Sequence, residues 1–191
     1  MTLNPIIDFH ASRIYMVPMN SSREANIVGA LALALADDIM QSTEHHAHEV
    51  GSAAAALTLV GHEPGLSIND LRAGIGLSHP GAVRLVDRLA AAGMVSRRPA
   101  TDDRRAVALT LTPTGKTACQ SIAAARQDAL ARGMAILNPH ERTVFAALAA
   151  KMLQGLVRDE DHASSVCRLC DFDRCTRCPV DAQLTSRAAS A

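Results

Sequence analysis

The sequence predicts a mainly α-helical fold with one small β-hairpin. Hydrophobic residues make up 48% of the 191 residues but aromatic residues only 2%. The core must therefore be built from Leu, Val, Ile, Met and much Ala, which suits closely packed helices better than a β-sandwich. Helix-start signals recur along the chain, whereas the period of two that is typical of strands appears between residues 94 and 111. These observations together indicate a helical protein with one hairpin inserted among its helices.

The N-terminal part predicts an arm followed by three helices. Residues 1–20 contain two prolines and are expected to form an irregular arm. Residues 21–24 (S-S-R-E) have the form of a capping box and begin a helix that should run to about residue 49. A short Ala-rich helix is expected over residues 52–60. Ser67 then caps a very short helix that ends at residues 74–76 (G-I-G).

The next segment predicts a helix and then the hairpin. Residues 78–80 (S-H-P) begin the helix, with proline in its first turn, and Gly93 ends it. Its buried side is expected to carry Val83, Val86 and Leu89. Residues 94–98 and 107–111 then form two short strands around the polar loop 99–105.

Two further helices and a tail complete the chain. Thr112 and Pro113 begin a long helix to about residue 137, and residues 138–141 (N-P-H-E) combine an N-cap, proline and glutamate at the start of another. Phe145, Leu148, Met152 and Leu156 form the apolar stripe of that helix. From residue 162 onward the sequence is expected to be a polar tail that carries cysteines.

The net charge of zero conceals a basic segment. Residues 72–105 contain seven arginines and three aspartates, a local charge of +4, so the rest of the chain carries −4. A concentrated positive charge of this kind is typical of a surface that binds nucleic acid.

The order helix, tight turn, helix and hairpin is that of a winged helix-turn-helix. The second helix should turn His79, Arg84, Asp87 and Arg88 outward, where arginine can contact guanine or a phosphate in the major groove. Arg104 and Arg105 on the hairpin loop should reach a narrow minor groove. The sequence therefore predicts a protein that binds double-stranded DNA.

Residues 66–115 resemble the MarR family of bacterial transcription regulators. The resemblance rests on VRLVDRLAAAGMVSRR, on DDRR in the hairpin loop and on LTPTG at the next helix; with the flanking helices it covers about residues 25–160. It implies a mainly α-helical fold with a helical dimerisation domain (residues 21–51 and 113–160) and a winged helix-turn-helix DNA-binding domain (residues 52–112). It also implies a homodimer on a palindromic operator and a small effector between the two domains.

The resemblance assigns roles to individual residues. Residues 78–88 match the recognition helix, which places Ser78 and His79 at its start and Arg84 at a position that often contacts DNA. Asp103 and Arg105 match the D-x-R pair of the wing. The DNA-binding set is Ser78, His79, Arg84, Arg88, Asp103, Arg104 and Arg105. The implied protein is a transcriptional regulator, expected to be a repressor, and not an enzyme.

Four of the five cysteines lie within twelve residues of the tail, residues 161–191. These tail cysteines form two C-x-x-C pairs: Cys167, Cys170, Cys175 and Cys178. Two such pairs can chelate one ion, so the tail is predicted to bind metal, with Zn(II) the first expectation and an iron–sulfur cluster the alternative. Arg168, Arg174 and Arg177 should offset the thiolate charge. The tail follows the last helix of the dimerisation region, so the metal is expected to act on the winged domain only through that helix.

Other features carry weaker expectations. Cys119 is expected to be a small core residue, and the histidines at 45, 46 and 48 a solvated helix end. The longest apolar run, residues 27–36, falls short of the ~20 residues that span a membrane, and no secretory leader is visible, so a soluble cytoplasmic protein is expected. Two other functions stay open: a metal-dependent protein-interaction module without DNA binding, and a thiol–disulfide protein.

Overall fold

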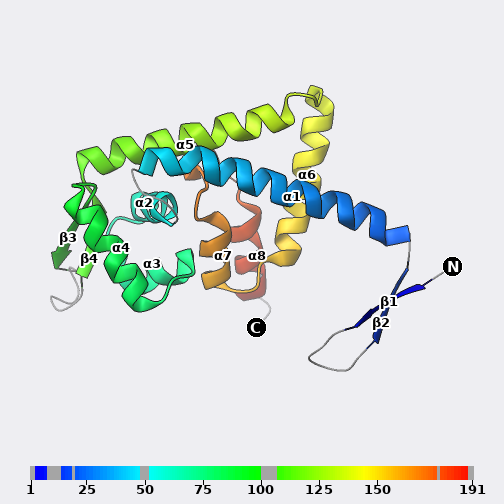
Figure 1. Ribbon diagram of the computed structural model, residues 1–191, viewed down its shortest axis with the longest axis horizontal. Coiled ribbons are helices and arrows are strands. Elements are labelled where there is room, and N and C mark those ends of the chain that lie inside the picture. Colours follow the sequence, from blue (N-terminus) through cyan, green and yellow to red (C-terminus); the bar gives the residue numbers. More distant parts are fainter. Residues whose placement is uncertain are drawn as a thin grey trace. The chain divides into compact units, whose positions relative to one another are not determined.

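The computed structural model describes residues 3–7, 14–18, 20–47, 52–99, 107–175 and 177–188. The chain divides into two units, residues 1–38 and residues 39–191, and each is described by itself. In both, helices dominate, and the sheets are two separate two-stranded ribbons, as the ribbon diagram shows (Figure 1). The predicted fold class is confirmed.

The first unit begins with a hairpin where an irregular arm was predicted. Strand β1 (Leu3–Ile7) pairs antiparallel with β2 (Ile14–Pro18), with Leu3 opposite Pro18 and Ile7 opposite Ile14. The prediction was wrong because it gave the two prolines more weight than the isoleucines and valine around them, which favour strands. In a two-stranded ribbon every strand is an edge, where proline is tolerated.

Helix α1 (Asn20–Glu44) starts in the first unit and ends in the second, where the 3-10 turn η1 (His45–Ala47) follows it. The helix was expected to continue to about residue 49; residues 48–51 lie outside the described part of the chain. The Thr43 hydroxyl donates to the Ile39 carbonyl at 2.8 Å, within the last turn. Such bonds from threonine to the preceding turn weaken and bend helices, and a helix end commonly tightens into a 3-10 turn.

The second unit holds the helix-turn-helix, the wing, two long helices and the folded tail. In chain order its elements are α2 (Ala53–His62), α3 (Ile68–Ile75), α4 (His79–Ala91), β3 (Val95–Pro99), β4 (Val107–Leu111), α5 (Pro113–Met134), α6 (Pro139–Leu156), α7 (Glu160–Cys167), η2 (Phe172–Arg174) and α8 (Pro179–Ala188). The helix starts predicted at Ser67, Ser78, Thr112 and Asn138 are all N-caps, and each side chain accepts a hydrogen bond from a backbone N–H in the first turn.

The main core surrounds α2. Residues 53–60 of this helix are buried on every side, because η1, α3, β4 and α5 pack around it. Leu57, Leu71, Leu85 and Leu109 are among the fully buried side chains and come from four different elements. A core made almost entirely of aliphatic residues therefore ties the helix-turn-helix to the wing.

The wing is a short antiparallel hairpin anchored at its base. Strands β3 and β4 pair with Val95 opposite Leu111 and Pro99 opposite Val107. The chain before α3 joins them, because Leu109 donates its N–H to the Leu66 carbonyl at 3.0 Å and accepts from the Gly65 N–H at 2.8 Å. At the end of the hairpin the Thr112 hydroxyl donates to the Gly93 carbonyl at 2.6 Å. These bonds fix the wing relative to both ends of the helix-turn-helix.

The tail is folded and does not trail away from the protein. Helix α7 lies against α3, and α8 lies against α6 (Figure 1). Val157, Ala163 and Val180 form a second, smaller buried cluster, against which Val166 and Leu184 pack. The sequence predicted a polar, cysteine-bearing tail from residue 162 onward but did not reveal helices α7 and α8, because the apolar residues spaced along them supply a core too sparse to stand out in composition.

Candidate functional site

The helix-turn-helix is built by a tight turn between α3 and α4. Gly76, with a φ of 68°, ends α3 in the left-handed conformation, which glycine adopts without steric cost. Leu77 donates its N–H to the Arg72 carbonyl at 3.1 Å. The Ser78 side chain then accepts the N–H of Gly81 at 3.3 Å and caps α4. Three residues thus reverse the chain and present the start of α4 on the surface.

Helix α4 separates a buried face from a polar outer face. Ala82, Leu85, Val86 and Leu89 are its buried residues. Val83, predicted to be buried, is only half-buried, because it lies at the edge of the buried face and not at its centre. The four residues predicted to point outward are all exposed: His79, Arg84, Asp87 and Arg88. Ser78 of the predicted DNA-binding set is exposed as well. The small Ala82 is fully buried and so takes no part in the outer surface.

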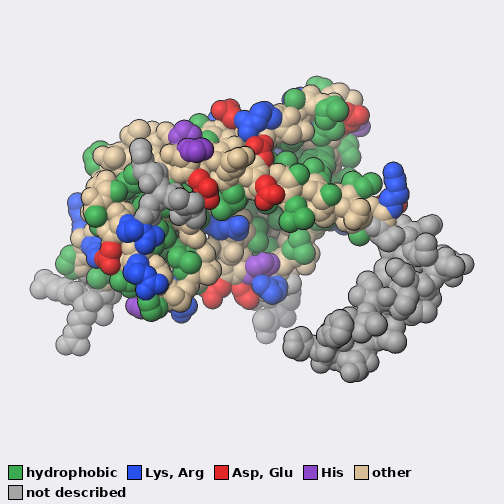
Figure 2. All heavy atoms as spheres, viewed as in Figure 1, with side chains coloured by type: hydrophobic (Ala, Val, Ile, Leu, Met, Phe, Trp, Pro, Cys, Tyr) green, Lys and Arg blue, Asp and Glu red, His purple; other side chains and the backbone are tan. Residues whose placement is uncertain are grey.

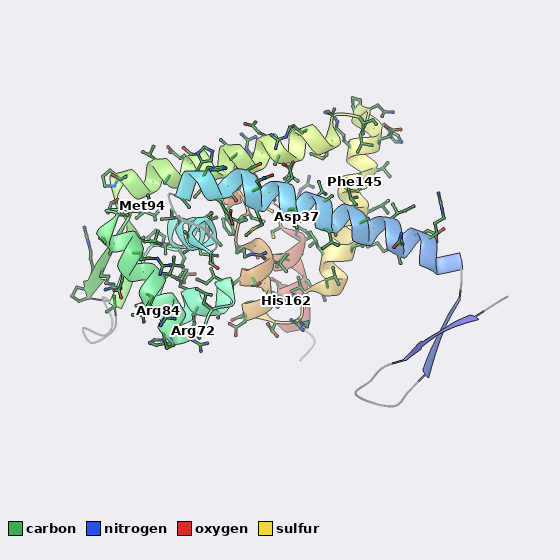
Figure 3. The ribbon with its side chains drawn as sticks, in the orientation of Figure 1. Asp37, Arg72, Arg84, Met94, Phe145 and His162 are labelled. Carbon is green, nitrogen blue, oxygen red and sulfur yellow. The ribbon has the colours of Figure 1, made fainter. Side chains whose placement is uncertain are left out.

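The outer face is basic. In Figure 3 Arg72 and Arg84 project from α3 and α4 on the side away from α5, and Figure 2 shows lysine and arginine side chains gathered over this end of the second unit. No other described residue forms a hydrogen bond or ion pair with Arg84. Its guanidinium, which carries five donors in a planar fork, is therefore available to a ligand.

The first turn of α4 is held by a side-chain network that sequence reasoning missed. The Asn69 amide oxygen lies 3.2 Å from His79 Nδ1 and accepts from Arg72 Nε at 3.3 Å. His79 is therefore positioned by α3, with its Nδ1 facing Asn69. The i, i+3 spacing of Asn69 and Arg72 on a helix was a signal for the first half of this contact.

A second contact ties α4 to the wing. Arg97 Nη2 of β3 lies 2.6 Å from Asp87 Oδ1, and both side chains are partly exposed. The sequence reading counted Arg97 only as part of the basic segment and did not identify this ion pair. The pair links the helix to the hairpin, and it places a cation beside the one carboxylate on the outer face of α4.

The wing residues Asp103, Arg104 and Arg105 lie outside the described residues, which stop at Pro99 and resume at Val107. Their positions relative to α4 therefore stay a prediction. The described pairing of the two strands extends to Pro99 and Val107, the residues that flank this segment.

The four tail cysteines line one cavity of about 730 Å³ between the tail and the helix-turn-helix. Cys167 is hydrogen-bonded to Cys170, and Cys175 to Cys178. The hydrogen bond from the Cys167 thiol lowers the pKa of Cys170 to about 6, and the guanidinium of Arg126 acts in the same direction. The same hydrogen bond, followed by burial, raises the pKa of Cys167 far above its ordinary value. Desolvation, followed by the bond to Cys178, raises the pKa of Cys175 to about 11.

The cation that faces the thiols comes from an unexpected helix. Arg126 of α5 lies among the cavity residues and acts on Cys170. The three tail arginines were predicted to do this, but Arg168 donates to the Ser165 carbonyl at 2.6 Å and Arg174 pairs with Asp171 at 3.1 Å. Arg126 lies more than forty residues before the thiols, and no local spacing pointed to it.

Metal-ligand geometry is not already formed. Across the described part of the chain, no three side chains of His, Cys, Asp or Glu are grouped so as to hold a metal ion. The four tail cysteines are free thiols that line one shared cavity. Cys119 lies apart from them, half-buried against Gly61 of α2, and burial raises the pKa of its thiol.

A second cavity, of about 500 Å³, lies between η1 and the start of α5. His45 and His46 line it, together with the hydroxyl-bearing residues Thr114, Thr117 and Ser121. The histidine cluster was expected to be a solvated helix end; His45 and His46 are exposed just after the end of α1, as expected, and also line this cavity, whereas His48 lies outside the described residues.

Comparisons with known proteins agree with this arrangement. A family model of the MarR family matches residues 51–106. The fold is similar to that of the YusO protein from Bacillus subtilis, with a TM-score of 0.60 and 21% identity over 72% of this chain and 99% of that one. It is also similar to the reduced form of MarR from E. coli, with a TM-score of 0.57 and 18% identity over 73% and 98%.

A third solved structure is a cysteine-to-serine mutant of MarR from E. coli complexed with operator DNA. The likeness has a TM-score of 0.53 and 21% identity, and covers 69% of this chain and 96% of that one. The comparison with curated proteins found no match. No helix in the described residues is long and apolar enough to cross a membrane. The segment matched by the family model runs from α2 to the hairpin loop, and the similarity in fold to these solved structures extends over about seventy percent of the chain; the winged helix-turn-helix segment of this chain is similar to the MarR family.

Proposed function

We propose that the protein is a transcriptional regulator, not an enzyme, that binds a palindromic operator in double-stranded DNA as a homodimer and represses transcription there. The observation that carries the proposal is the outer face of α4, where Ser78, His79, Arg84 and Arg88 are exposed on a helix braced from both sides. A braced helix with a basic outer face fits the major groove.

Two side-chain contacts hold the DNA-recognition helix α4 against its neighbours. Asn69 holds His79 at the start of α4, and Arg97 holds Asp87 further along the helix. Because the Arg97 guanidinium offsets the Asp87 carboxylate, this carboxylate repels a phosphate less than an unpaired one would. Side chains on such a helix lose less freedom on binding, which raises affinity for the DNA sequence that fits them.

Dimer formation is supported by apolar surface that one chain leaves exposed. On α6, Val144, Leu148, Met152 and Leu156 are 43%, 58%, 51% and 60% exposed, and α6 has no buried residue. On the part of α1 in the first unit, Ile27, Val28, Leu31 and Leu33 are exposed as well. Continuous apolar surface of this kind marks an interaction site, and a second copy of the chain supplies a matching one.

The cavity beside His45 and His46 is the proposed site of a small effector. It lies where η1 meets the start of α5, close to Met94 at the base of the wing. Two imidazoles and three hydroxyl groups offer both donors and acceptors, so a polar ligand that binds there can alter how the wing is held.

The direct test is a gel shift with the purified full-length protein. The probe is the DNA immediately upstream of its own coding sequence, and the control is a scrambled fragment of equal length. We expect a discrete complex on the first probe that survives excess scrambled competitor. Equal binding to both would reject sequence-specific recognition, and no binding to either would favour the protein-interaction module.

Arg84→Ala is expected to weaken operator binding by about 1–3 kcal/mol if the side chain makes a bidentate base contact. Arg84 is exposed and makes no bond to another described residue, so the folded state should keep its stability. A titration on operator and on scrambled DNA measures the effect. If the loss is equal on both, Arg84 is a phosphate anchor and does not read a base.

Arg105→Ala is expected to reduce affinity and also to flatten its dependence on salt, by up to roughly one unit of slope, because one phosphate or minor-groove contact is lost. The loop that carries Arg105 lies outside the described residues, so this prediction rests on the sequence motif. Thermal unfolding should not change. An unaltered affinity at all salt concentrations would rule out a DNA contact by the wing.

A further inference from the structure

The tail is docked directly on the helix-turn-helix. Gly74 of α3 faces α7 so closely that a methyl group on it would stand 3.4 Å from the Ser164 Cβ. After α7, Leu169 enters the main core beside residues of α2 and α3. This contradicts the expectation that the tail can act on the winged domain only through the last long helix: α7 touches the first helix of the DNA-reading motif itself.

A ring contact completes the docking. Phe172 of η2 stacks on His62 at the end of α2, with the ring centroids 3.4 Å apart and the ring planes within 9°. One turn of chain between Cys170 and Cys175 thus carries the contact with α2. An interaction that fixes Cys170 and Cys175 therefore also keeps Phe172 stacked on His62.

The four thiols share one cavity, although they are not yet grouped as metal ligands. Cys167 at the end of α7 and Cys178 before α8 pack against the small tail core, while Cys175 is exposed on the connecting turn. All four cysteines nevertheless line the same cavity. Moving the exposed turn inward brings four sulfurs around one point.

Four thiolates in this arrangement match the ligand set of zinc, which takes tetrahedral sulfur ligands at about 2.3 Å. Without a cation, ionised thiols this close repel one another; a divalent cation removes the repulsion and closes the turn. Arg126 from α5 offsets part of the remaining negative charge. The donor set is therefore chemically complete within the described residues.

We propose that the four tail cysteines bind one zinc ion per chain, and that this ion clamps α7 and Phe172 onto the helix-turn-helix. Metal occupancy then controls how firmly α3, and through it the start of α4, is held. The link from α3 to α4 is the contact between Asn69 and His79. The regulatory consequence rests on the proposed function, but the metal site and the clamp do not.

Metal analysis of the full-length protein, purified without oxygen, tests the site. We expect about one zinc per chain in the wild type and in Cys119→Ser, and loss of most of it in Cys175→Ser. Cys119 is the matched control because it is a half-buried thiol outside the set. Iron and sulfide with absorbance near 400 nm would overturn the zinc assignment, and four freely titrating thiols without metal would overturn the centre.

Amide hydrogen exchange in α3, measured with and without a chelator, tests the clamp independently of DNA. Removing zinc should speed exchange in α3 and α7 several-fold. The Phe172→Ala variant should still bind zinc, but the amide hydrogens of its α3 should exchange fast whether or not zinc is bound. The control Arg174→Ala changes an exposed residue of the same turn and should behave as the wild type. If the amide exchange rate of α3 in the wild type is the same with and without zinc, the proposed clamp is wrong.

The DNA readout separates the two proposals. If the wild type binds its upstream DNA, removal of zinc should shift that affinity several-fold, and Phe172→Ala should abolish the shift. If no variant binds DNA while zinc still slows exchange in α3, the proposed function fails and the clamp stands. An affinity for DNA that is the same with and without zinc would overturn the regulatory role.

Discussion

Gly115→Ala should lower the free energy of unfolding by about 2–3 kcal/mol, at the upper end of the usual cost of overpacking. A Cβ on Gly115 would stand about 2.0 Å from the Met94 carbonyl oxygen and 2.9 Å from its carbon. Both atoms are backbone, so no side-chain rotation relieves the contact. Either α5 or the base of the wing must move, and the Thr112 bonds to the carbonyls of Gly93 and Met94 would then be strained.

Chemical denaturation followed by circular dichroism measures this loss. The matched control is Gly29→Ala, because Gly29 is an exposed glycine inside α1 with no atom within 4 Å of its added Cβ. That change should stabilise the helix by about 0.5–1 kcal/mol, the ordinary gain when alanine replaces a helical glycine. Equal effects of the two substitutions would show that α5 does not pack on Met94 as described.

Gly115 also shows what the sequence could and could not reveal. The pattern T-P-T-G predicted a helix start, because Thr at the N-cap and Pro at the first position are local signals. The packing of Gly115 on Met94 is a contact across twenty-one residues and has no local signature. For the same reason every predicted N-cap in the second unit was confirmed, while the bond between Asp87 and Arg97 was missed.

The tail was predicted least well. Its cysteine spacing was evident, because chelating pairs are short-range patterns. Its fold was not, because Val157, Ala163 and Val180 come from three separate segments and form a core only when α8 returns to α6. Arg126 and His62 reach the tail from helices far away in the sequence. The chelating spacing of the cysteines was evident from the sequence, but the position of the tail against α2 and α3 required the tertiary structure.

Leu148→Asp should raise the dissociation constant of the proposed homodimer by roughly a thousandfold to ten-thousandfold. Leu148 is 58% exposed in one chain and lies in the apolar stripe of α6 with Val144 and Met152. If a second copy covers this stripe, a carboxylate there is buried without a partner, at a cost of about 2–3 kcal/mol. The change occurs in both copies, so the cost doubles, and about 1.4 kcal/mol corresponds to each factor of ten.

Sedimentation velocity over a range of concentrations measures the dissociation constant. Ala146→Asp is the control, because the substitution adds the same charge to the same helix. Ala146 is exposed and lies about 200° around the helix from Leu148. The control should remain a dimer, and both variants should keep the helix content of the wild type. Loss of the dimer in Leu148→Asp should also lower operator affinity, because two half-sites are bound cooperatively only when the two DNA-binding domains are linked. A Leu148→Asp variant that stays dimeric would move the interface away from α6, and the exposed residues of α1 would then be the surface to change next.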